Sequence, residues 1–380
     1  MPSNKAFCIR PWTSACVRTN GDITLCCQSA EQSKHNLKTS TIANWWTSEF
    51  VHNIRSKILS GETPNECTEC SAQEAHGSQS LRQKTNADYK IFEQYADKML
   101  AHYNYPASQP IELELQLTNL CNLKCLMCVE TESSSIYSEN KTLKIHQIGS
   151  QDYTVTLAEI TQIEEWIKTQ PRLINLRGGE PLIVPEIKRL LRWAIDSKLL
   201  DNTQVHITTN ATKLDSEWFN ILTAIPNLRV MVSIDAVGQL NDYIRFGSNW
   251  TSIEENVKAI SGIPNVELIV HAAIQNLNIL SVNQLIGWCK QQNYYLDYQV
   301  VTYPKIFSVT NLPKQLIEQA KTKLTTVNSK VASELVAILE NHQIDLWTEL
   351  QTEINLRDTI RKTSIIDVIP EFKDHWHDND

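Results

Sequence analysis

The sequence predicts an α/β protein in which parallel strands curve into a partial (β/α)6 barrel, preceded by a cysteine-rich module and followed by helices. From residue 111 onward, short β-rich runs alternate with amphipathic runs of helical spacing, which is typical of a parallel sheet wrapped by helices. Six such repeats are present, fewer than the eight of a closed barrel. Cysteines gather near the N-terminus and directly after the first predicted strand.

Each predicted strand is a short apolar run that ends at polar or turn residues. The predicted strands are 111–118, 173–177, 204–209, 228–235, 266–274 and 296–302. The predicted helices between them are 157–169, 186–199, 215–225, 252–260 and 281–292. Helical patterns also dominate beyond Pro313, and we expect those helices to pack against the barrel. In such barrels ligands bind at the C-terminal ends of the strands, so the residues that follow each strand are the candidate site.

Length and charge limit the possible functions. The 380 residues divide into a cysteine module at 1–75, a connector at 76–110, the barrel at 111–305 and a helical region at 306–380. The net charge of -8 provides no broad basic face, so small molecules or peptides fit better than nucleic acid. No secretory leader is evident, and no apolar run approaches the ~20 residues of a membrane span. We expect a cytoplasmic protein, whose cysteines are metal ligands rather than disulfides.

Three cysteines follow the first predicted strand at a C-x3-C-x2-C spacing: Cys121, Cys125 and Cys128. Electron-carrying four-iron clusters are held by four cysteines, so three thiolates leave one iron open to another ligand. A zinc knuckle or a set of buried free thiols is the alternative, although structural zinc requires a closed tetrahedral set.

This loop resembles the signature loop of the radical SAM enzymes. The resemblance implies a [4Fe-4S] cluster whose open iron chelates S-adenosylmethionine, and whose electron cleaves that cofactor to a 5'-deoxyadenosyl radical. It also implies an external one-electron reductant such as a flavodoxin or a ferredoxin. One departure is Met127, because the residue before the third cysteine is commonly aromatic in the family.

The second predicted strand is followed by Gly178, Gly179 and Glu180. Paired glycines let backbone carbonyls approach a ligand that any Cβ would hold away, although a lone Gly-Gly is usually a turn. The run resembles the GGE motif of the family, which implies contact with the amino group of the bound methionine moiety.

The third strand ends at Thr208 and Thr209, and Asn210 follows, offering hydroxyl and amide groups that suit ribose hydroxyls. The run resembles the TNG motif of the family, with Asn210 and Thr208 as the implied ribose ligands. A polar strand cap is the alternative. Ala211 replaces the family glycine, so a positive φ at this position would be strained.

The fourth strand ends Ser233-Ile234-Asp235, and Arg245 follows. Both resemble features of the family, and the resemblance implies that Ser233 and Arg245 hold the carboxylate of the cofactor. A guanidinium is a natural bidentate partner for a carboxylate, although surface pairing is the alternative for Arg245. Asp235 is the residue expected to face substrate.

A second set of cysteines precedes the barrel: Cys8, Cys26, Cys67 and Cys70. The turn at Asn20-Gly21 predicts a hairpin that returns Cys26 to the side of Cys8. The stretch resembles the SPASM and Twitch modules, which implies an auxiliary [4Fe-4S] cluster, here before the barrel rather than after it. A zinc ribbon is the alternative. Cys27 leaves open which of the two adjacent cysteines is the ligand.

The polar stretch at 131–156 follows the cysteine loop and is either a lid or a plain surface excursion. Together these features predict an oxidoreductase or maturase that abstracts hydrogen from a peptide or small-molecule substrate and oxidises it. The alternatives are a radical SAM enzyme acting on a nucleoside or carbohydrate metabolite, and a non-enzymatic protein stabilised by zinc.

Overall fold

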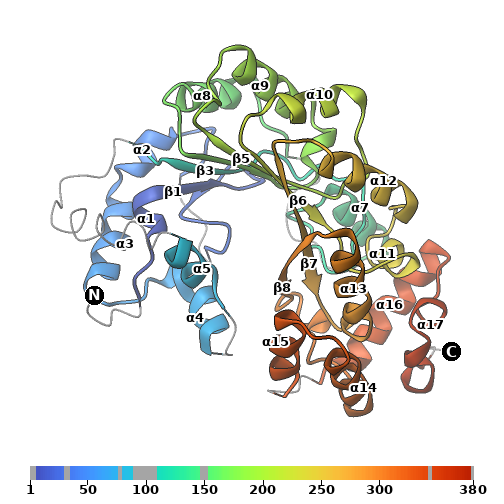
Figure 1. Ribbon diagram of the computed structural model, residues 1–380. Helices are drawn as coiled ribbons and strands as arrows, with labels where there is room; N and C mark the ends of the chain where they lie inside the picture. Colours follow the sequence, from blue (N-terminus) through green and yellow to red (C-terminus); the bar gives the residue numbers. More distant parts are fainter. Residues whose placement is uncertain are drawn as a thin grey trace.

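The computed structural model describes residues 6–29, 35–75, 79–88, 109–145, 153–340 and 345–377. They form one curved, mostly parallel sheet in the order β2-β1-β3-β4-β5-β6-β7-β8, with helices along its outer side (Figure 1). The fold is therefore an α/β partial barrel, as the sequence predicts.

The six predicted barrel strands are all present. Three of them coincide with the prediction: β4 (Leu173–Arg177), β5 (Gln204–Thr209) and β7 (Val266–Ile274). Three differ only at their ends: β3 (Glu112–Gln116), β6 (Leu228–Ser233) and β8 (Tyr295–Val300). All neighbouring pairs from β3 to β8 are parallel, so their C-terminal ends meet at one rim.

Three of the six described helices of the barrel begin at a residue whose side chain accepts from a free N–H group of the first turn. The six are α8 (Leu157–Ile167), α9 (Pro185–Asp196), α10 (Ser216–Ala224), α11 (Gln239–Ile244), α12 (Trp250–Ser261) and α13 (Val282–Gln292). Thr156 and Glu159 form a reciprocal capping box at the start of α8. The Asp215 side chain accepts from Trp218 N at the start of α10, and the Asn249 side chain accepts from Ser252 N at the start of α12.

The N-terminal segment joins the sheet of the barrel directly. β1 (Ser14–Val17) pairs antiparallel with β2 (Ile23–Thr24), and Gly21 in the turn has φ +86, which confirms the predicted hairpin. β1 also pairs in parallel with β3, a contact that the sequence analysis does not anticipate. The cysteine-bearing hairpin is therefore fixed against the first barrel strand.

Short helices surround this hairpin: α1 (Arg10–Thr13), α2 (Ile42–Trp46), α3 (Glu49–Leu59), α4 (Thr68–Ala75) and α5 (Leu81–Asp88). The Arg55 guanidinium lies 4.4 Å from the ring of the buried Trp46 and donates to Pro11 O at 2.8 Å. These contacts connect α3 to the segment that carries Cys8.

The two faces of the sheet differ in polarity. Val205 and Ile207 on β5 are buried in the core beneath the helices, whereas His206 and Thr208 alternate with them and point to the concave face. On the same face, Ser233 of β6 is in register with His271 of β7. A polar concave face suits a polar ligand inside the barrel.

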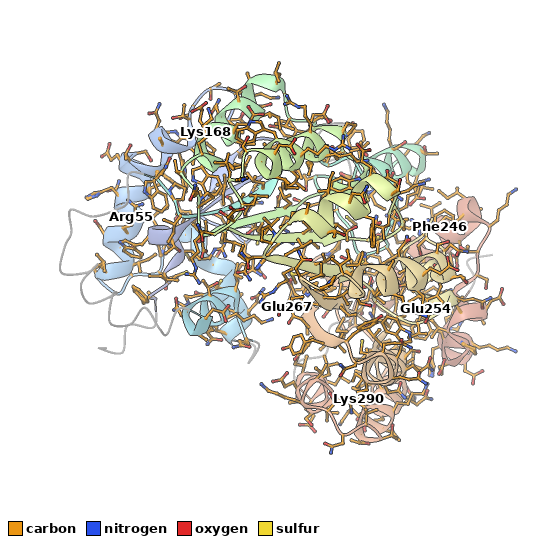
Figure 2. All side chains as sticks on the ribbon, turned by 45° about the horizontal axis from the view of Figure 1, so that its top comes forward. Arg55, Lys168, Phe246, Glu254, Glu267 and Lys290 are labelled. Carbon is orange, nitrogen blue, oxygen red and sulfur yellow. The ribbon has the colours of Figure 1, made fainter. Side chains whose placement is uncertain are left out.

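The predicted C-terminal helices are α14 (Lys314–Thr325), α15 (Lys330–Leu339), α16 (Trp347–Arg361) and α17 (Ile365–Val368). The stretch after the cysteine loop contains a helix, α7 (Ser134–Leu143), and residues 146–152 of it lie outside the described part of the chain. Phe246, labelled in Figure 2, lies where the C-terminal helices meet the barrel, with the Arg361 guanidinium 4.7 Å from its ring. Among the described helices, none combines the length and apolarity of a membrane span.

Candidate active site

The cysteine loop follows β3 at the C-terminal rim and is held by backbone contacts. Lys124 N donates to Phe246 O, and Leu126 N donates to Ile244 O, both at 2.9 Å. The Ser135 hydroxyl donates to Cys121 O at 2.6 Å. These bonds attach the loop to the end of α11 and to the start of α7.

The three thiols of the loop are close enough to influence each other. Burial, with a further contribution from the neighbouring Cys125, raises the pKa of Cys121 to about 12. Burial also raises the pKa of Cys128, with added repulsion from Cys125 and Cys121. Such mutual repulsion between thiolates is relieved when the same cation or cluster binds them all. The predicted triad is therefore brought together.

The glycine pair is packed against the cysteine loop. Gly179 N donates to Thr118 O at 2.9 Å, and Glu180 N donates to Leu120 O at 2.8 Å. A Cβ on Gly179 would lie 2.1 Å from Leu120 O, and Gly178 has φ +120. Glycine is required here because two backbone segments touch. Contact of this loop with an amino group stays a prediction.

The Glu180 carboxylate is used within the protein. It accepts from Leu182 N at 3.0 Å, from the Thr209 hydroxyl at 2.7 Å and from Asn210 N at 2.7 Å, and it is 1% exposed. Burial raises its pKa. Its side chain joins the end of β4 to the end of β5, so any contact with a cofactor comes from the backbone of this loop.

The end of β5 is shaped by Asn210 and Ala211. Asn210 Nδ2 donates to Asn122 Oδ1 at 3.0 Å, which joins this strand end to the cysteine loop. Ala211 has φ +55, the left-handed conformation that costs an L-residue roughly 1 kcal/mol. Thr208 is half-buried on the concave face, one strand away from Arg177. The ribose-binding roles of Thr208 and Asn210 stay predictions.

Arg245 lies beside the cysteine loop in a buried ion pair. Its Nε lies 2.8 Å from Asp235 Oδ2, and its Nη1 donates to Cys125 Sγ at 3.8 Å. Asp235 is 0% exposed and also accepts from Ala273 N at 2.8 Å. The expectation that Asp235 faces substrate is therefore corrected, because its carboxylate is buried and already paired. Ser233 is half-buried at the end of β6, and its carboxylate-binding role stays a prediction.

The four predicted N-terminal thiols also come together. Burial, with smaller contributions from Cys67 and Cys70, raises the pKa of Cys8 to about 12. Burial likewise raises the pKa of Cys26 to about 12, with Cys8 and Cys70 as neighbouring thiols. Cys70 Sγ donates to Gln28 Oε1 at 3.5 Å, so α4 lies against the loop that carries Cys26.

The structure distinguishes the two adjacent cysteines of that loop. Cys26 has Cys8 and Cys70 as thiol neighbours, whereas Cys27 interacts mainly with Glu114 and Arg177. Arg177 Nη1 donates to Cys27 Sγ at 3.6 Å. Cys26 is therefore the one directed to the four-thiol group.

Both thiol sets fit iron-sulfur clusters in their chemistry. Cysteine thiolates are the usual cluster ligands, and the Arg245 guanidinium and the backbone N–H of Leu123 are hydrogen-bond donors to thiols of the triad. Within the described residues, no group of three or more His, Cys, Asp or Glu side chains is arranged to hold a single metal ion. The predicted ligands are the seven thiols of the two sets.

Two sets of ion pairs on the sheet are not predicted from the sequence. Glu114 on β3 pairs with Arg10 and with Arg177, each at 3.1 Å. On the concave face, His271 Nδ1 lies 2.8 Å from Asp297 Oδ2. Alternation along β3 and β7 predicts which face these side chains occupy, but their partners come from distant segments.

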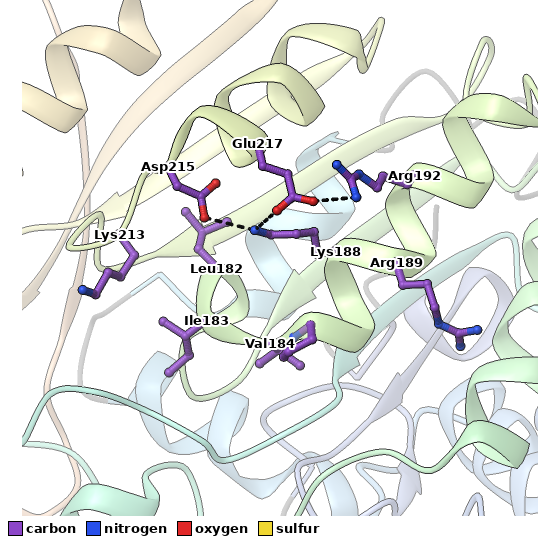
Figure 3. Close-up of a pocket in the computed structure, with 10 residues that line it drawn as sticks. Leu182, Ile183, Val184, Lys188, Arg189, Arg192, Lys213, Asp215 and Glu217 are labelled. Atoms are coloured by element: carbon purple, nitrogen blue, oxygen red, sulfur yellow. Dashed lines mark hydrogen bonds and ion pairs between the residues drawn. The ribbon is translucent and has the colours of Figure 1, made fainter.

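A surface pocket outside the thiol sites is lined by charged residues that pair with one another. It lies between the start of α9 and the loop before α10 (Figure 3). Lys188 reaches Asp215 at 3.1 Å and Glu217 at 2.8 Å, and Arg192 also pairs with Glu217. None of the cysteines lines this pocket. It is not part of the candidate active site.

Comparisons with known proteins agree with this geometry. The profile of the Radical SAM superfamily matches residues 115–274, and that of an iron-sulfur cluster-binding domain (SPASM) matches residues 8–71. The sporulation killing factor maturation protein SkfB of Bacillus subtilis (strain 168) is 26% identical over 49% of this chain and 41% of its own length. A GTP 3',8-cyclase of Peptoclostridium acidaminophilum is 28% identical over 40% of this chain and 42% of its own.

Among solved structures, anSMEcpe with bound AdoMet and Cp18Cys peptide aligns with a TM-score of 0.40 and 16% identity, over 56% of this chain and 57% of that chain. The chain spans about two fifths of the length of the two curated relatives.

Proposed function

We propose that this chain is a maturase that oxidises a peptide or small-molecule substrate. The proposal proceeds from its family, because the chain belongs to the radical SAM superfamily and carries an N-terminal iron-sulfur module. The oxidation begins with removal of a hydrogen atom from an unactivated carbon. The observation that carries the proposal is the pair of thiol sets joined to one sheet. The triad follows β3, and the hairpin that bears Cys26 pairs with the same strand.

The two thiol sets would hold clusters with different roles. Cys121, Cys125 and Cys128 would hold the reducing [4Fe-4S] cluster, and Cys8, Cys26, Cys67 and Cys70 would hold the auxiliary one. When bound, the first cluster and S-adenosylmethionine supply the 5'-deoxyadenosyl radical. The protein positions these groups and excludes competing reactions.

Residues at the ends of three strands, together with Arg245 after α11, would seat S-adenosylmethionine. The backbone at Gly178, Gly179 and Glu180 would contact its amino group, and Thr208 and Asn210 its ribose. Ser233 and Arg245 would hold its carboxylate, which requires Arg245 to share its guanidinium between that carboxylate and Asp235. Arg245 presents five N–H donors, so it has the capacity for both.

An oxidative outcome also requires a proton acceptor. We assign this role to His271, whose Nδ1 is bonded to Asp297, which leaves Nε2 as the basic atom. The substrate would lose a hydrogen atom to the 5'-deoxyadenosyl radical, a proton to His271 and an electron to the auxiliary cluster. The product then carries one new double bond or crosslink and two fewer hydrogens.

The relatives favour two substrate classes. Similarity to a maturation protein supports a peptide, and similarity to a GTP 3',8-cyclase supports a nucleotide as the second candidate. The polar concave face is compatible with either class. The proposal includes a cytoplasmic location and a flavodoxin or ferredoxin as electron donor, because the cluster needs an external reductant and a reducing compartment.

Anaerobic reconstitution with iron and sulfide tests the proposal. We expect about eight irons per chain and release of 5'-deoxyadenosine from S-adenosylmethionine with dithionite. Replacing Cys121, Cys125 and Cys128 by alanine should abolish that release, whereas replacing Cys67 and Cys70 should leave part of it. Cys289→Ala is the control, because this thiol is buried in α13 outside both sets.

Tightly bound zinc with no cleavage of S-adenosylmethionine would refute the enzyme hypothesis and support a zinc-stabilised binding protein. Equal loss of cleavage in both cysteine variants, with both folded, would refute the division of roles between the two thiol sets.

A further inference from the structure

We propose that Arg10 is the buried counter-ion of the auxiliary thiol set and that it raises the reduction potential of the cluster held there. This inference rests on the proposed function, because it requires Cys8, Cys26, Cys67 and Cys70 to hold an iron-sulfur cluster. It assigns a positioning and charge-balancing role to a residue outside the ligand set.

Arg10 is placed by the chain beside the thiols. It is the first residue of α1, two positions after Cys8, and its backbone N–H hydrogen-bonds the Cys8 thiol. Its guanidinium pairs with Glu114 at 3.1 Å and lies close enough to Cys8, Cys26 and Cys27 to interact with their charges. A positive charge therefore lies next to at least two of the four predicted ligands.

The guanidinium retains a free donor in this buried position. Nη2 is bonded to Glu114 at 3.1 Å, and the Arg10 side chain is 13% exposed. The Nε–H is buried and has no hydrogen-bond partner among the described residues. A buried donor without a partner costs roughly 1–3 kcal/mol. Cluster sulfurs accept N–H hydrogen bonds, and such bonds tune cluster potentials.

Glu114 holds this guanidinium and connects it to the barrel. One carboxylate oxygen pairs with Arg10 and the other with Arg177, directly before the glycine pair. Arg177 in turn donates to Cys27 at 3.6 Å. Glu114 is thus shared by two arginines, and Glu132 and Arg18 are the next charged groups near Arg177, so the five groups together carry a net charge of +1. Reduction adds one negative charge to a cluster, so a nearby cation stabilises the reduced form and raises the potential.

The test uses a chain in which Cys121, Cys125 and Cys128 are alanine, so that any remaining cluster is the auxiliary one. Iron is quantified, and the potential is measured by redox titration followed by EPR. Arg10→Gln removes the charge, and we expect its equilibrium constant for reduction to fall at least tenfold, which is 59 mV for a one-electron couple. Arg10→Lys keeps the charge and should restore most of the difference.

Two further variants separate a charge effect from a structural one. Glu114→Gln leaves both arginines unneutralised and should shift the potential upward, opposite to Arg10→Gln. Arg229→Gln is the control, because Arg229 pairs with Glu267 on the neighbouring strand β7, away from the auxiliary thiols. If Arg10→Gln loses its iron, the inference is tested by Glu114→Gln alone: an upward shift of the reduction potential supports it, and a downward shift or none overturns it.

An unchanged potential in Arg10→Gln with full iron content, or shifts of the same sign in Arg10→Gln and Glu114→Gln, would overturn the inference. Absence of iron from the triple-alanine chain would also overturn it. That last result leaves the proposed function standing if the unaltered chain still cleaves S-adenosylmethionine.

Discussion

Replacing Glu139 by glutamine tests whether the C-terminal helices stabilise the cysteine loop. Glu139 on α7 is 1% exposed in its side chain and accepts from Arg361 at 3.0 and 2.5 Å and from Arg357 at 2.6 Å. Arg361 also donates to Lys124 O, inside the cysteine loop, at 2.9 Å. The bonds join α16 to α7 and to the loop that carries the three predicted cluster ligands.

The expected cost follows from the charges left behind. Removing one partner of a buried ion pair costs about 3–5 kcal/mol, because the remaining charge is uncompensated. Arg357 keeps Glu353 at 2.7 Å, and Arg361 keeps Lys124 O, so we place the loss at the lower end, about 3 kcal/mol. That loss lowers the folding equilibrium constant more than a hundredfold.

Urea denaturation of the cluster-free protein, followed by circular dichroism, measures this loss. Glu318→Gln is the matched control, because Glu318 forms an exposed pair with Lys321 on α14 and should change stability by less than about 0.5 kcal/mol. A loss below 1 kcal/mol in Glu139→Gln, or an equal loss in the control, would refute the reasoning. Reduced iron retention by the variant would show that the effect reaches the cysteine loop.

Two smaller changes test the strand ends and the barrel interior. Gly179→Ala should destabilise the protein by roughly 1–3 kcal/mol and reduce iron binding, because the new Cβ would lie 2.1 Å from Leu120 O. Gly287→Ala on α13 is the control, because nothing lies within 4 Å of its new Cβ, and it should stabilise the protein by about 0.5 kcal/mol. Similar shifts of the melting temperature in the two glycine variants would contradict the proposed clash at Gly179. Burial lowers the pKa of His206 from 6.5 to about 4, so the folded protein keeps this ring neutral. As the pH falls from 6.5 to 4, the unfolded chain binds a proton at His206 and the folded chain does not, so the free energy of unfolding decreases. Between pH 6.5 and 4 the free energy of unfolding should therefore fall less in His206→Gln than in the wild type, by on the order of 2 kcal/mol. Urea denaturation at several pH values measures this, and parallel curves for the two proteins would contradict it.

Local patterns were sufficient to predict most of the fold. The strands β4, β5 and β7 coincide with their predicted bounds because each is a short apolar run bounded by turn residues. The hairpin at Gly21 was predicted because its turn requires a positive φ. The parallel pairing of β1 with β3 was not, since strand pairing across about a hundred residues leaves no local signal.

The same division applies to the candidate site. The spacing of Cys121, Cys125 and Cys128 determined the first thiol set, because these ligands lie within one loop and need little help from the rest of the chain. Only the tertiary structure decided that Cys26, and not Cys27, joins the second set, since adjacent residues of an irregular loop point in different directions. It also decided that Asp235 is buried with Arg245.

The sequence by itself therefore determined the class of fold and the family, and it predicts the ligands of the radical-generating cluster, all from local spacing. Only the tertiary structure decided how charge is distributed around the two clusters. The pairs of Arg10 with Glu114 and of Arg361 with Glu139 join residues more than a hundred positions apart. Which charges meet depends on how the sheet and the C-terminal helices pack, because electrostatic partners are selected by distance in space and not by distance along the chain.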